Sequence, residues 1–522
     1  MNAPLPPLLP GLPVVGNLVD FVRKRHETLR RGYETYGPVF AMKLGPQPVA
    51  VLAGPDHHQF FFKETDATLN IEKAYQFLAA MFGQVGFTAS PEVYQRQRPV
   101  MMAPFQSSKM AGYVAVMAEE TQRWLDGLGN LGAFEISKTM ERLTLQIAAH
   151  ALMGREFSEQ VGPPFFELYR QLANGLDPIS PPNWPLPHFI KRDRAKAKMY
   201  GILGEIIDQR RASDREFDDF LQSFIEARYR DGAPVERETI TALVIALIFA
   251  GHETTAGQAS WTIIELLRAP EYRGLVERER AEVLAGGRQL DLPALRQLKH
   301  LEWAAKEIER LHPSADILMR ANNASYEVGG YHIPAGWNTM ISPKLSHRLP
   351  EVFRDPERFD PLRFGPGREE DRKHQFTLIG FGGGIHKCPG MNFAYNEIKV
   401  IATMLMEQFD LELATRDPGT KFGLGAAHPT PTWVRYQRKA GPRRGAEPVA
   451  AAACPVDHSA VAPAPAEQSV EHQALVAAQT GAGPAACPVD HQVATAEPAG
   501  AAPAVCPVDH SAGVTSEQPA DA

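Results

Sequence analysis

The chain has 522 residues, of which 44% are hydrophobic and 22% charged, and its formal net charge is −7. This length and composition allow a large buried core. Residues 1–440 contain 52 Lys and Arg against 52 Asp and Glu, so the body lacks the basic excess that is typical of nucleic-acid binding. The four cysteines are too few for a disulfide framework in a chain of this size.

Residues 441–522 have a different composition. They contain two Arg and nine acids, no Phe, Trp or Tyr, and many Ala, Pro, Val and Gly residues. Such a segment buries too little apolar surface to offset the entropy cost of ordering it. We therefore predict one catalytic domain at 1–440 and a disordered tail at 441–522.

The pentapeptide CPVDH occurs three times in this tail, at 454–458, 487–491 and 506–510. Each copy offers a thiol and an imidazole four residues apart, and both groups are possible metal ligands. The Cys-Pro pair also resembles short haem-regulatory motifs. An inert spacer or a docking tag for a partner protein is an equally open interpretation.

No apolar stretch is long enough to cross a membrane. The longest, at 240–251, has about twelve residues, whereas a spanning helix needs about 20. The N-terminal sequence MNAPLPPLLPGLPVVGNL lacks the basic start and continuous apolar centre of a signal peptide. We expect an extended lead-in, no membrane anchor, and a soluble cytoplasmic protein.

Residue patterns along the chain predict a mainly α protein with a minor antiparallel β part. From about 107 to 270 the periodicity is mainly helical and is interrupted by a proline-rich segment at 177–188, and a long irregular loop precedes the last helix. The expected elements are a helix at 21–36, two strands in PVFAMKLG and PVAVLAG, helices within 107–270 and 293–311, short strands around 325–336, a loop at 342–384, and a helix at 391–407.

The helix expected at 236–268 is apolar on every face in its first half, which predicts a path through the centre of the fold. About 33 residues at ~1.5 Å each give a length of about 50 Å. AGHETTAG, at 250–257, then brings polar groups into this buried helix. Threonine hydroxyls there can bond to the preceding turn and bend it. The alternative is a groove where a ligand and a proton source meet.

The sequence FGGGIHKCPG, at 381–390, is the strongest chemical signal. Three glycines allow tight turns and close backbone approach. Cys388 precedes a predicted helix, whose N-terminus would stabilise a thiolate. A buried Cys considered alone can equally be inert.

Three further motifs change this balance. Glu307-Ile308-Glu309-Arg310 is followed downstream by Pro356-Glu357-Arg358-Phe359, and Ala250-Gly251-His252-Glu253-Thr254-Thr255 lies in the long helix. In this order, together with the Cys388 motif, they resemble the cytochrome P450 family over about residues 8–440. The resemblance implies the cytochrome P450 fold, a haem b (iron protoporphyrin IX) cofactor, and a haem-thiolate monooxygenase that uses O2.

The resemblance also implies roles for single residues. Cys388 is the expected iron ligand, and Phe381 shields its sulfur. His386 and Arg320 are expected to pair with the haem propionates, with Arg96 or Arg98 as a further candidate.

Within the same resemblance, Glu253 and Thr254 are the expected proton-delivery groups, because an acid and a hydroxyl can hold an ordered water chain. Glu307, Arg310 and Arg358 resemble the family's buried structural triad, which does no chemistry. Pro389 has no N–H, so we expect fewer hydrogen bonds to the sulfur.

Two segments resemble sterol 14α-demethylases: AYQFLAAMFG at 74–83 and the stretch at 172–199. Tyr75 would then contact haem or substrate, and Phe77, Phe82 and Phe87 would line the pocket. Ordinary core packing is the alternative for these aromatic side chains. Glu253 departs from the demethylase pattern, which commonly has His there, and so does Phe87-Thr88. The expected substrate is therefore a bulky apolar molecule: a sterol, a steroid or a terpenoid.

No flavin or iron–sulfur motif occurs in the chain, so a separate ferredoxin or flavodoxin is the expected electron donor. Lys387 and Lys399 flank the ligand and either attract an acidic partner or are solvated surface. A P450-like isomerase or ligand sensor is the alternative function. Glu253 and Thr254 argue against it, because both proton-delivery groups are present.

Overall fold

The computed structural model describes residues 3–440 except 178–179, 182–183 and 423–425. The chain divides into two units, Met1–Pro442 and Arg443–Ala522. The predicted disordered tail and the three CPVDH repeats lie outside the described residues.

The N-terminal part is a helix packed on a mixed sheet. Helix α1 (Leu18–Tyr36) precedes the antiparallel hairpin of β1 (Val39–Leu44) and β2 (Gln47–Leu52), which confirms the predicted pair of strands. β2 then pairs in parallel with β8 (Asn338–Ile341), and the sheet continues through β5 (Leu318–Asn322) to β3 (Leu69–Asn70). The other pairs of this sheet are antiparallel, and β2 and β8, which come from distant parts of the chain, form its one parallel pair.

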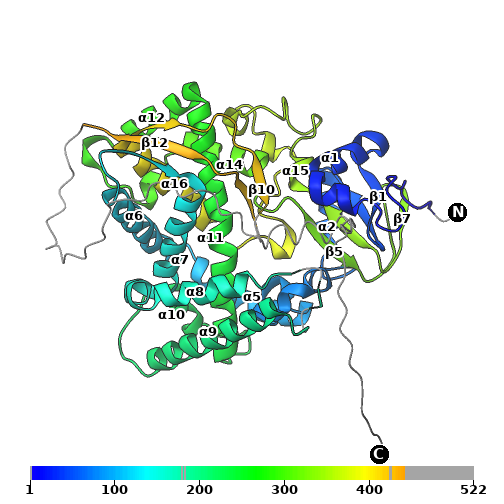
Figure 1. Ribbon diagram of the computed structural model, residues 1–522, viewed down its shortest axis with the longest axis horizontal. Coiled ribbons are helices and arrows are strands. Elements are labelled where there is room, and N and C mark those ends of the chain that lie inside the picture. The colour runs from blue at the N-terminus through cyan, green and yellow to red at the C-terminus, as the bar shows by residue number, and fades with distance from the viewer. Residues whose placement is uncertain (1–2, 178–179, 182–183, 423–425, 441–522) are drawn as a thin grey trace, which may run out of the picture. The chain divides into compact units, whose positions relative to one another are not determined.

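The helical part is built around α11 (Arg237–Arg268), which runs through its middle in Figure 1. Helices α7 (Ile136–Gln160), α14 (Lys299–Leu311) and α16 (Met391–Gln408) pack against it, and α6 (Met110–Asp126) packs against α7 and α16. The other α-helices are α2 (Pro55–Lys63), α3 (Ile71–Ala74), α4 (Ala79–Phe82), α5 (Pro91–Met102), α8 (Gly162–Ala173), α9 (Pro187–Arg211), α10 (Phe220–Glu226), α12 (Pro270–Val283), α13 (Leu292–Leu295) and α15 (Pro343–Ser346). The mainly α prediction is confirmed.

Helix α11 is continuous through AGHETTAG. The hydroxyl of Thr254 donates to the carbonyl of Ala250 at 2.6 Å, and Ser260 and Thr262 bond to their preceding turns in the same way. These hydroxyls are therefore satisfied within the helix and need no break in it. Within the described chain, α11 is the one helix long and apolar enough to cross a membrane, yet most of that apolar window is buried. It is the core helix of this fold.

Several short strands were not predicted from the sequence. Strands β4 (Leu131–Glu135), β12 (Trp433–Arg438) and β9 (Phe409–Leu413) form an antiparallel sheet with β12 in the centre. Two further hairpins join β10 (Thr420–Phe422) to β11 (Ala427–Pro429), and β6 (Tyr326–Val328) to β7 (Tyr331–Ile333). Only the last pair was predicted.

Candidate active site

Cys388 lies just before α16, and its surroundings stabilise a negative charge on one side. Its backbone N–H donates to the carbonyl of Phe381 at 2.9 Å, and the backbone N–H groups of Gly390 and Met391 hydrogen-bond to its sulfur. Burial is the larger effect and raises the pKa of the Cys388 thiol. The side chain is nevertheless solvent-accessible. A thiol backed by N–H donors and open on the other side suits a metal ligand, because a bound cation would favour the thiolate.

The glycines before Cys388 are required by neighbouring protein atoms. A Cβ on Gly383 would lie 2.7 Å from the ring of Phe62, and one on Gly384 would lie 2.8 Å from the Phe62 carbonyl. Gly382 and Gly384 also have positive φ values of 70° and 63°, which glycine adopts without strain. The predicted close approach is therefore an approach to Phe62 of α2.

A buried carboxyl lies behind this loop. Glu309 of α14 accepts a hydrogen bond from Tyr395 and contacts Gly380 so closely that a Cβ there would lie 2.3 Å from Glu309 Cγ. Burial raises the pKa of Glu309 to about 7. Glu309 was not identified from the sequence, although it lies inside the Glu307-to-Arg310 motif. Its negative form also raises the pKa of Cys388.

His386 and Arg320 converge on one turn. His386 Nε2 lies 2.6 Å from Asp66 Oδ2, and Arg320 Nε donates to Thr65 Oγ1 at 3.2 Å. Arg320 is 3% exposed, and burial lowers its pKa. The structure thus places both cationic candidates at Thr65-Asp66. Asp66, which sequence reasoning missed, already compensates part of this charge.

The two arginines left open by the sequence occupy different surroundings. Arg98 hydrogen-bonds to Tyr94, whose ring stacks on His386 with centroids 4.0 Å apart. Arg96 instead lies 3.7 Å from Glu236 and over the ring of Tyr229. Of the two, only Arg98 joins the cluster around His386.

The aromatic residues of the 74–88 segment form one cluster and one core contact. Tyr75 packs against Phe87 at 5.6 Å and Phe77 at 6.3 Å between ring centroids, and all three rings are half-buried. The Tyr75 hydroxyl accepts from the backbone N–H of Met319 at 3.3 Å. Phe82 is 1% exposed and packs on Phe249 of α11. Phe82 is therefore a core residue.

Glu253 and Thr254 lie on α11 beside a buried polar pair. Burial, and then the charge of Glu253, raise the pKa of Tyr169 on α8 well above its usual value. The Tyr169 hydroxyl lies 3.4 Å from His252 Nδ1. Burial lowers the pKa of His252 to about 4, so this imidazole is neutral at pH 7. Tyr169 and His252 were not identified from the sequence, although His252 lies within the motif.

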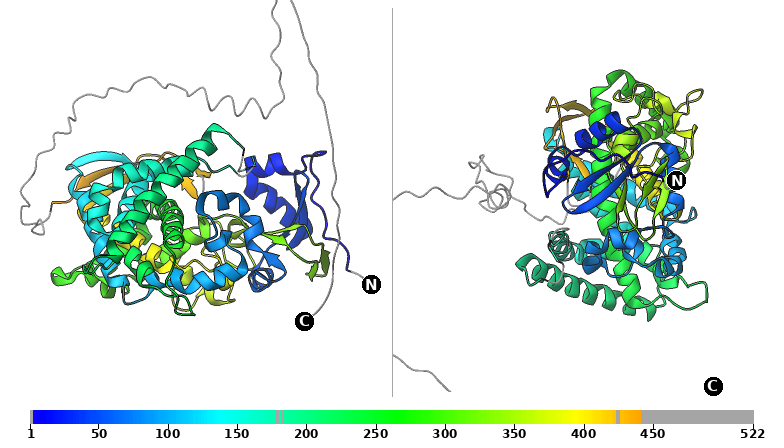
Figure 2. Two further views of the ribbon diagram at one scale, coloured as in Figure 1. Left: turned by 90° about the horizontal axis from the view of Figure 1, so that it is seen from below. Right: turned by 90° about the vertical axis from the view of Figure 1, so that its right-hand side faces the viewer.

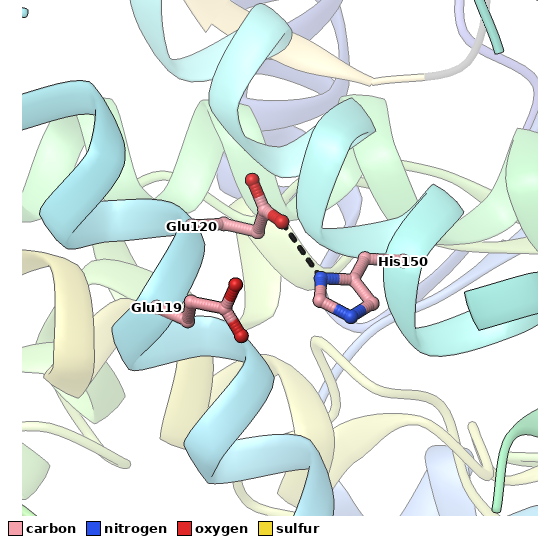
Figure 3. Close-up of side chains that lie close together, drawn as sticks. All are labelled: Glu119, Glu120 and His150. Carbon is pink, nitrogen blue, oxygen red and sulfur yellow. Dashed lines mark hydrogen bonds and ion pairs between the residues drawn. The ribbon is translucent and has the colours of Figure 1, made fainter. Parts of the chain in front are cut away.

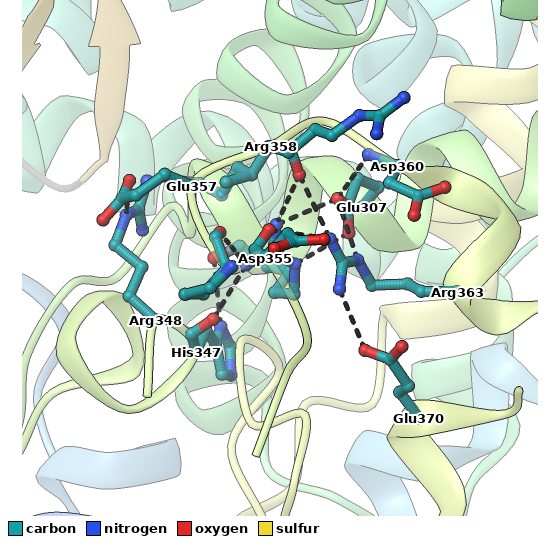
Figure 4. A network of polar contacts seen from close by, with 12 residues as sticks. Glu307, His347, Arg348, Asp355, Glu357, Arg358, Asp360, Arg363 and Glu370 are labelled. Carbon is teal, nitrogen blue, oxygen red and sulfur yellow. Dashed lines mark hydrogen bonds and ion pairs between the residues drawn. The ribbon is translucent and has the colours of Figure 1, made fainter. Parts of the chain in front are cut away.

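The buried triad differs from the sequence-based expectation. Arg310 pairs with Glu307 through two hydrogen bonds, at 2.7 and 2.9 Å, and Arg363 Nε donates to Glu307 Oε1 at 3.1 Å. Figure 4 shows this network, which continues from Arg363 to Glu370. Arg358 is exposed and contributes its backbone carbonyl. The prediction of Arg358 as the third member is therefore wrong, and Arg363 takes that place.

The expected surface charges beside Cys388 are only partly present. Lys387 is exposed. Lys399 is 4% exposed, donates to the carbonyl of Leu295 at 3.0 Å, and has a pKa lowered by burial. Neither interpretation of Lys399, as a partner contact or as solvated surface, is correct.

One cluster away from Cys388 has metal-ligand geometry. Glu119, Glu120 and His150 place a ligand atom each within 4.8 Å of one another (Figure 3). Arg123 Nη1 lies 2.7 Å from Glu120, and Arg155 pairs with Glu119. Because two guanidinium groups already balance the carboxylates, this cluster is an ion-pair network.

Comparisons with known proteins identify the family of this chain. The cytochrome P450 family model matches residues 6–432. A sterol 14-demethylase of Arabidopsis thaliana is 36% identical over 425 residues, which cover 79% of this chain and 87% of that protein. A sterol 14alpha-demethylase of Mycolicibacterium vanbaalenii is 33% identical, covering 81% of this chain and 96% of that protein. The solved structure of retinoic acid-bound cyanobacterial CYP120A1 superposes with a TM-score of 0.76 at 26% identity, over 84% of this chain and 100% of that chain.

The fold and the family match define an oxidoreductase that uses a haem. This chain belongs to the cytochrome P450 family, and it is a cytochrome P450 monooxygenase whose cofactor is haem b. The residues present fit that group, because an accessible thiol backed by N–H donors lies in the same fold as two cations that converge on one turn.

Proposed function

We propose that this monooxygenase removes the 14α-methyl group of a sterol. The observation that carries the proposal is an identity of 33–36% to sterol 14-demethylases over about four fifths of the chain. The half-buried cluster of Tyr75, Phe77 and Phe87 supports it, because large apolar substrates are held mostly by aromatic and aliphatic side chains.

In this proposal Cys388 is the iron ligand, and the bound haem supplies the oxidising iron centre that transfers one oxygen atom from O2. The carbonyl of Phe381 fixes the Cys388 backbone, and the N–H groups of Gly390 and Met391 hold negative charge at the sulfur. Pro389 contributes no N–H of its own. The two residues after Pro389, Gly390 and Met391, therefore supply the N–H donors to the sulfur.

The two haem propionates are assigned to the cluster at Thr65-Asp66. Arg320 reaches this turn from β5 and His386 from the loop before Cys388, and Arg98 joins the cluster through Tyr94. Asp66 holds the His386 imidazole in place, and the two arginines supply the positive charge.

Glu253 and Thr254 are assigned to proton transfer on α11. A carboxyl group and a hydroxyl on neighbouring residues can hold and pass protons through a bound water. The Thr254 hydroxyl donates to Ala250 and therefore presents its oxygen lone pairs as acceptors. Tyr169 lies close enough to Glu253 for the carboxylate charge to raise the Tyr169 pKa.

Electrons are proposed to come from a separate ferredoxin or flavodoxin in the cytoplasm. A cavity of about 460 Å³ opens on the Cys388 side and is lined in part by Arg296, Lys306 and Lys387. These cations would attract an acidic protein. Glu302 and Asp371 line the same cavity, so the charge complementarity to an acidic protein is limited to the part of the cavity that the cations line.

The test is a binding and turnover assay with the purified full chain and a surrogate electron-transfer system. Obtusifoliol and lanosterol, named in two of the relatives, should shift the iron toward high spin and yield a product lacking one methyl carbon. Retinoic acid and a steroid without the 14α-methyl group are the comparison ligands. Turnover of a terpenoid but of neither sterol would contradict the demethylase proposal and keep the monooxygenase.

A second candidate function is oxidation of another bulky apolar molecule, a steroid or a terpenoid, by the same monooxygenase. Glu253 is the observation that favours it, since demethylases commonly have His at this position. Oxygenated product from such a ligand, formed in proportion to the reduced nicotinamide consumed and without turnover of either sterol, would support this candidate.

A further inference from the structure

Glu309 and Tyr395 form a hydrogen-bonded pair to which the proposed function gives no role. The Tyr395 hydroxyl on α16 donates to Glu309 Oε2 on α14, and Glu309 is 5% exposed. A phenol bonded to a carboxylate is an arrangement in which a proton can pass between two oxygen atoms. Buried groups of altered acidity also concentrate at functional sites. The pair is therefore a candidate site for proton transfer.

The pair is connected to the Cys388 loop. The backbone N–H groups of Gly380 and Phe381 hydrogen-bond to the Glu309 carboxylate, and the Phe381 carbonyl accepts from the Cys388 N–H at 2.9 Å. The rings of Phe381 and Tyr395 lie 5.3 Å apart between centroids. After burial, the charge of Glu309 also raises the pKa of the Cys388 thiol. An unbroken series of contacts therefore leads from Cys388 through Phe381 to the Tyr395 phenol.

The surroundings favour loss of a proton and an electron together from Tyr395. Burial, and then the charge of Glu309, raise the pKa of the Tyr395 phenol well above its usual value, so loss of the proton alone is disfavoured. Loss of the electron alone would leave a positive charge in a poorly solvated place, which is also costly. Burial raises the pKa of Glu309 to about 7, so this carboxylate is a stronger base than an exposed one. Joint transfer avoids both charged forms of the phenol.

The hydroxyls of two other tyrosines at the site bond to the backbone. Tyr94 donates to the carbonyl of Ile385 at 3.0 Å, and Tyr75 accepts from the N–H of Met319 at 3.3 Å. A backbone amide is too weak a base to take up a phenolic proton. Of these three described tyrosines, Tyr395 is the one hydrogen-bonded to a carboxylate, and it alone is equipped for joint transfer.

Tyr395 also has an accessible side. It is half-buried and lines the cavity of about 460 Å³ together with Phe381 and Lys387. This cavity is also where the electron-donor protein is proposed to bind. A reductant in the cavity can therefore reach the phenol and return an electron to it.

From these observations we propose that Tyr395 is a redox-active residue that removes unused oxidising equivalents from the haem, with Glu309 as its proton acceptor. One electron leaves the Tyr395 ring and reduces the haem, while the phenolic proton passes to Glu309 Oε2. A neutral tyrosyl radical beside a carboxylic acid results. An electron from the donor protein or from ascorbate then restores the phenol, which takes its proton back from Glu309.

A second such cycle completes the reduction of an oxygen atom that no substrate has received. The two electrons, with two protons from solvent, convert that atom to water. The haem is thereby protected when the substrate is absent or badly placed. The proposal rests on the proposed ligation of the haem iron by Cys388, and it is independent of which substrate the enzyme oxidises.

The test is electron paramagnetic resonance of the full-length holoenzyme, frozen milliseconds after mixing with a peracid at mildly alkaline pH, without substrate. The wild type should show a tyrosyl radical whose hyperfine structure narrows when the protein contains ring-deuterated tyrosine. Tyr395→Phe should abolish this signal. Glu309→Gln keeps an oxygen that accepts the hydroxyl hydrogen bond but cannot take up the proton, so most of the signal should be lost.

Tyr229→Phe is the matched control. Tyr229 donates to Glu236 at 2.5 Å just before α11, so it has the same kind of partner but belongs to another part of the fold. Its replacement should leave the radical signal unchanged. Bleaching of the haem by the peracid should be faster in Tyr395→Phe than in Tyr229→Phe, and equal rates would overturn the protective role.

The reduced carbon monoxide spectrum of every variant separates loss of the radical from loss of the haem site. Tyr395→Phe combined with Glu309→Leu removes the buried carboxyl together with its partner, and it serves if the single variant fails to fold. A tyrosyl signal of wild-type size in either Tyr395 variant overturns the proposal. A wild type with the thiolate-type spectrum but no tyrosyl radical overturns this proposal alone, whereas a wild type without that spectrum overturns ligation by Cys388 as well.

Discussion

Replacing Arg363 by Met tests the buried network of Figure 4. Arg363 is fully buried and bonds to Glu307 at 3.1 Å, to Glu370 at 2.9 Å, and to the carbonyl of Arg354 at 2.6 Å. Methionine keeps much of the volume but leaves these acceptors without their donor. Removing one partner of a buried ion pair costs about 3–5 kcal/mol. At an unfolding entropy of about 2.1 cal/mol/K per residue over about 440 residues, the melting temperature should fall by about 3–5 °C.

The assay is thermal unfolding followed by circular dichroism and by the haem absorbance of the same sample. Arg358→Met is the matched control, because Arg358 is exposed and supplies only a carbonyl to the network. Its cost should stay within about 0.5 kcal/mol. Equal destabilisation by the two variants, or a larger effect at Arg358, would refute the reassignment of the third member to Arg363.

Cys388→Ala should abolish the thiolate-type absorbance of the reduced carbon monoxide complex, and retention of that absorbance would show that another residue holds the iron. Thr254→Ala should still bind haem and substrate but divert reductant to peroxide. If this variant still consumes reductant in proportion to product, the Thr254 hydroxyl serves only its hydrogen bond to the preceding helical turn. A chain ending at residue 440 should keep its haem content and its turnover with artificial donors, and loss of haem would contradict the predicted domain boundary. Because burial raises the pKa of Glu309 to about 7 from 4.5, the folded chain holds a proton that the unfolded chain releases between these values. Its contribution to stability is therefore present at low pH and lost as pH rises from about 4.5 to 7. Urea unfolding of Glu309→Gln should lack that part of the decline, and an identical pH profile would show that Glu309 is already ionised.

The sequence predicted the elements with strong local signals. Helices α11 and α16 and the β1–β2 hairpin have long periodic or alternating patterns bounded by Gly and Pro, and all three lie where expected. Strands β9 to β12 have three to six residues each, and β12 pairs with the distant β4 as well as with β9. Local patterning therefore carries little information about them.

The error at Arg358 has a specific cause. The chain contains two similar tetrapeptides, Pro356-Glu357-Arg358-Phe359 and Pro361-Leu362-Arg363-Phe364. Only tertiary structure shows that the second brings its guanidinium to Glu307. Burial caused the error at Lys399 in the same way, because the sequence gives the helix but not which of its faces is covered. Tyr169 was missed because it lies 83 residues before His252.

The order of synthesis bears on the sheet formed by β4, β12 and β9. β12 is the central strand and the last one made, and Thr432 N bonds to a Glu135 carboxylate oxygen 297 residues earlier in the chain. At about 5–20 residues per second, β4 leaves the ribosome roughly 15–60 s before its partner exists. During that interval its edge has no strand to pair with. Production of this enzyme therefore depends on whatever shields that edge in the nascent chain until the final strand arrives.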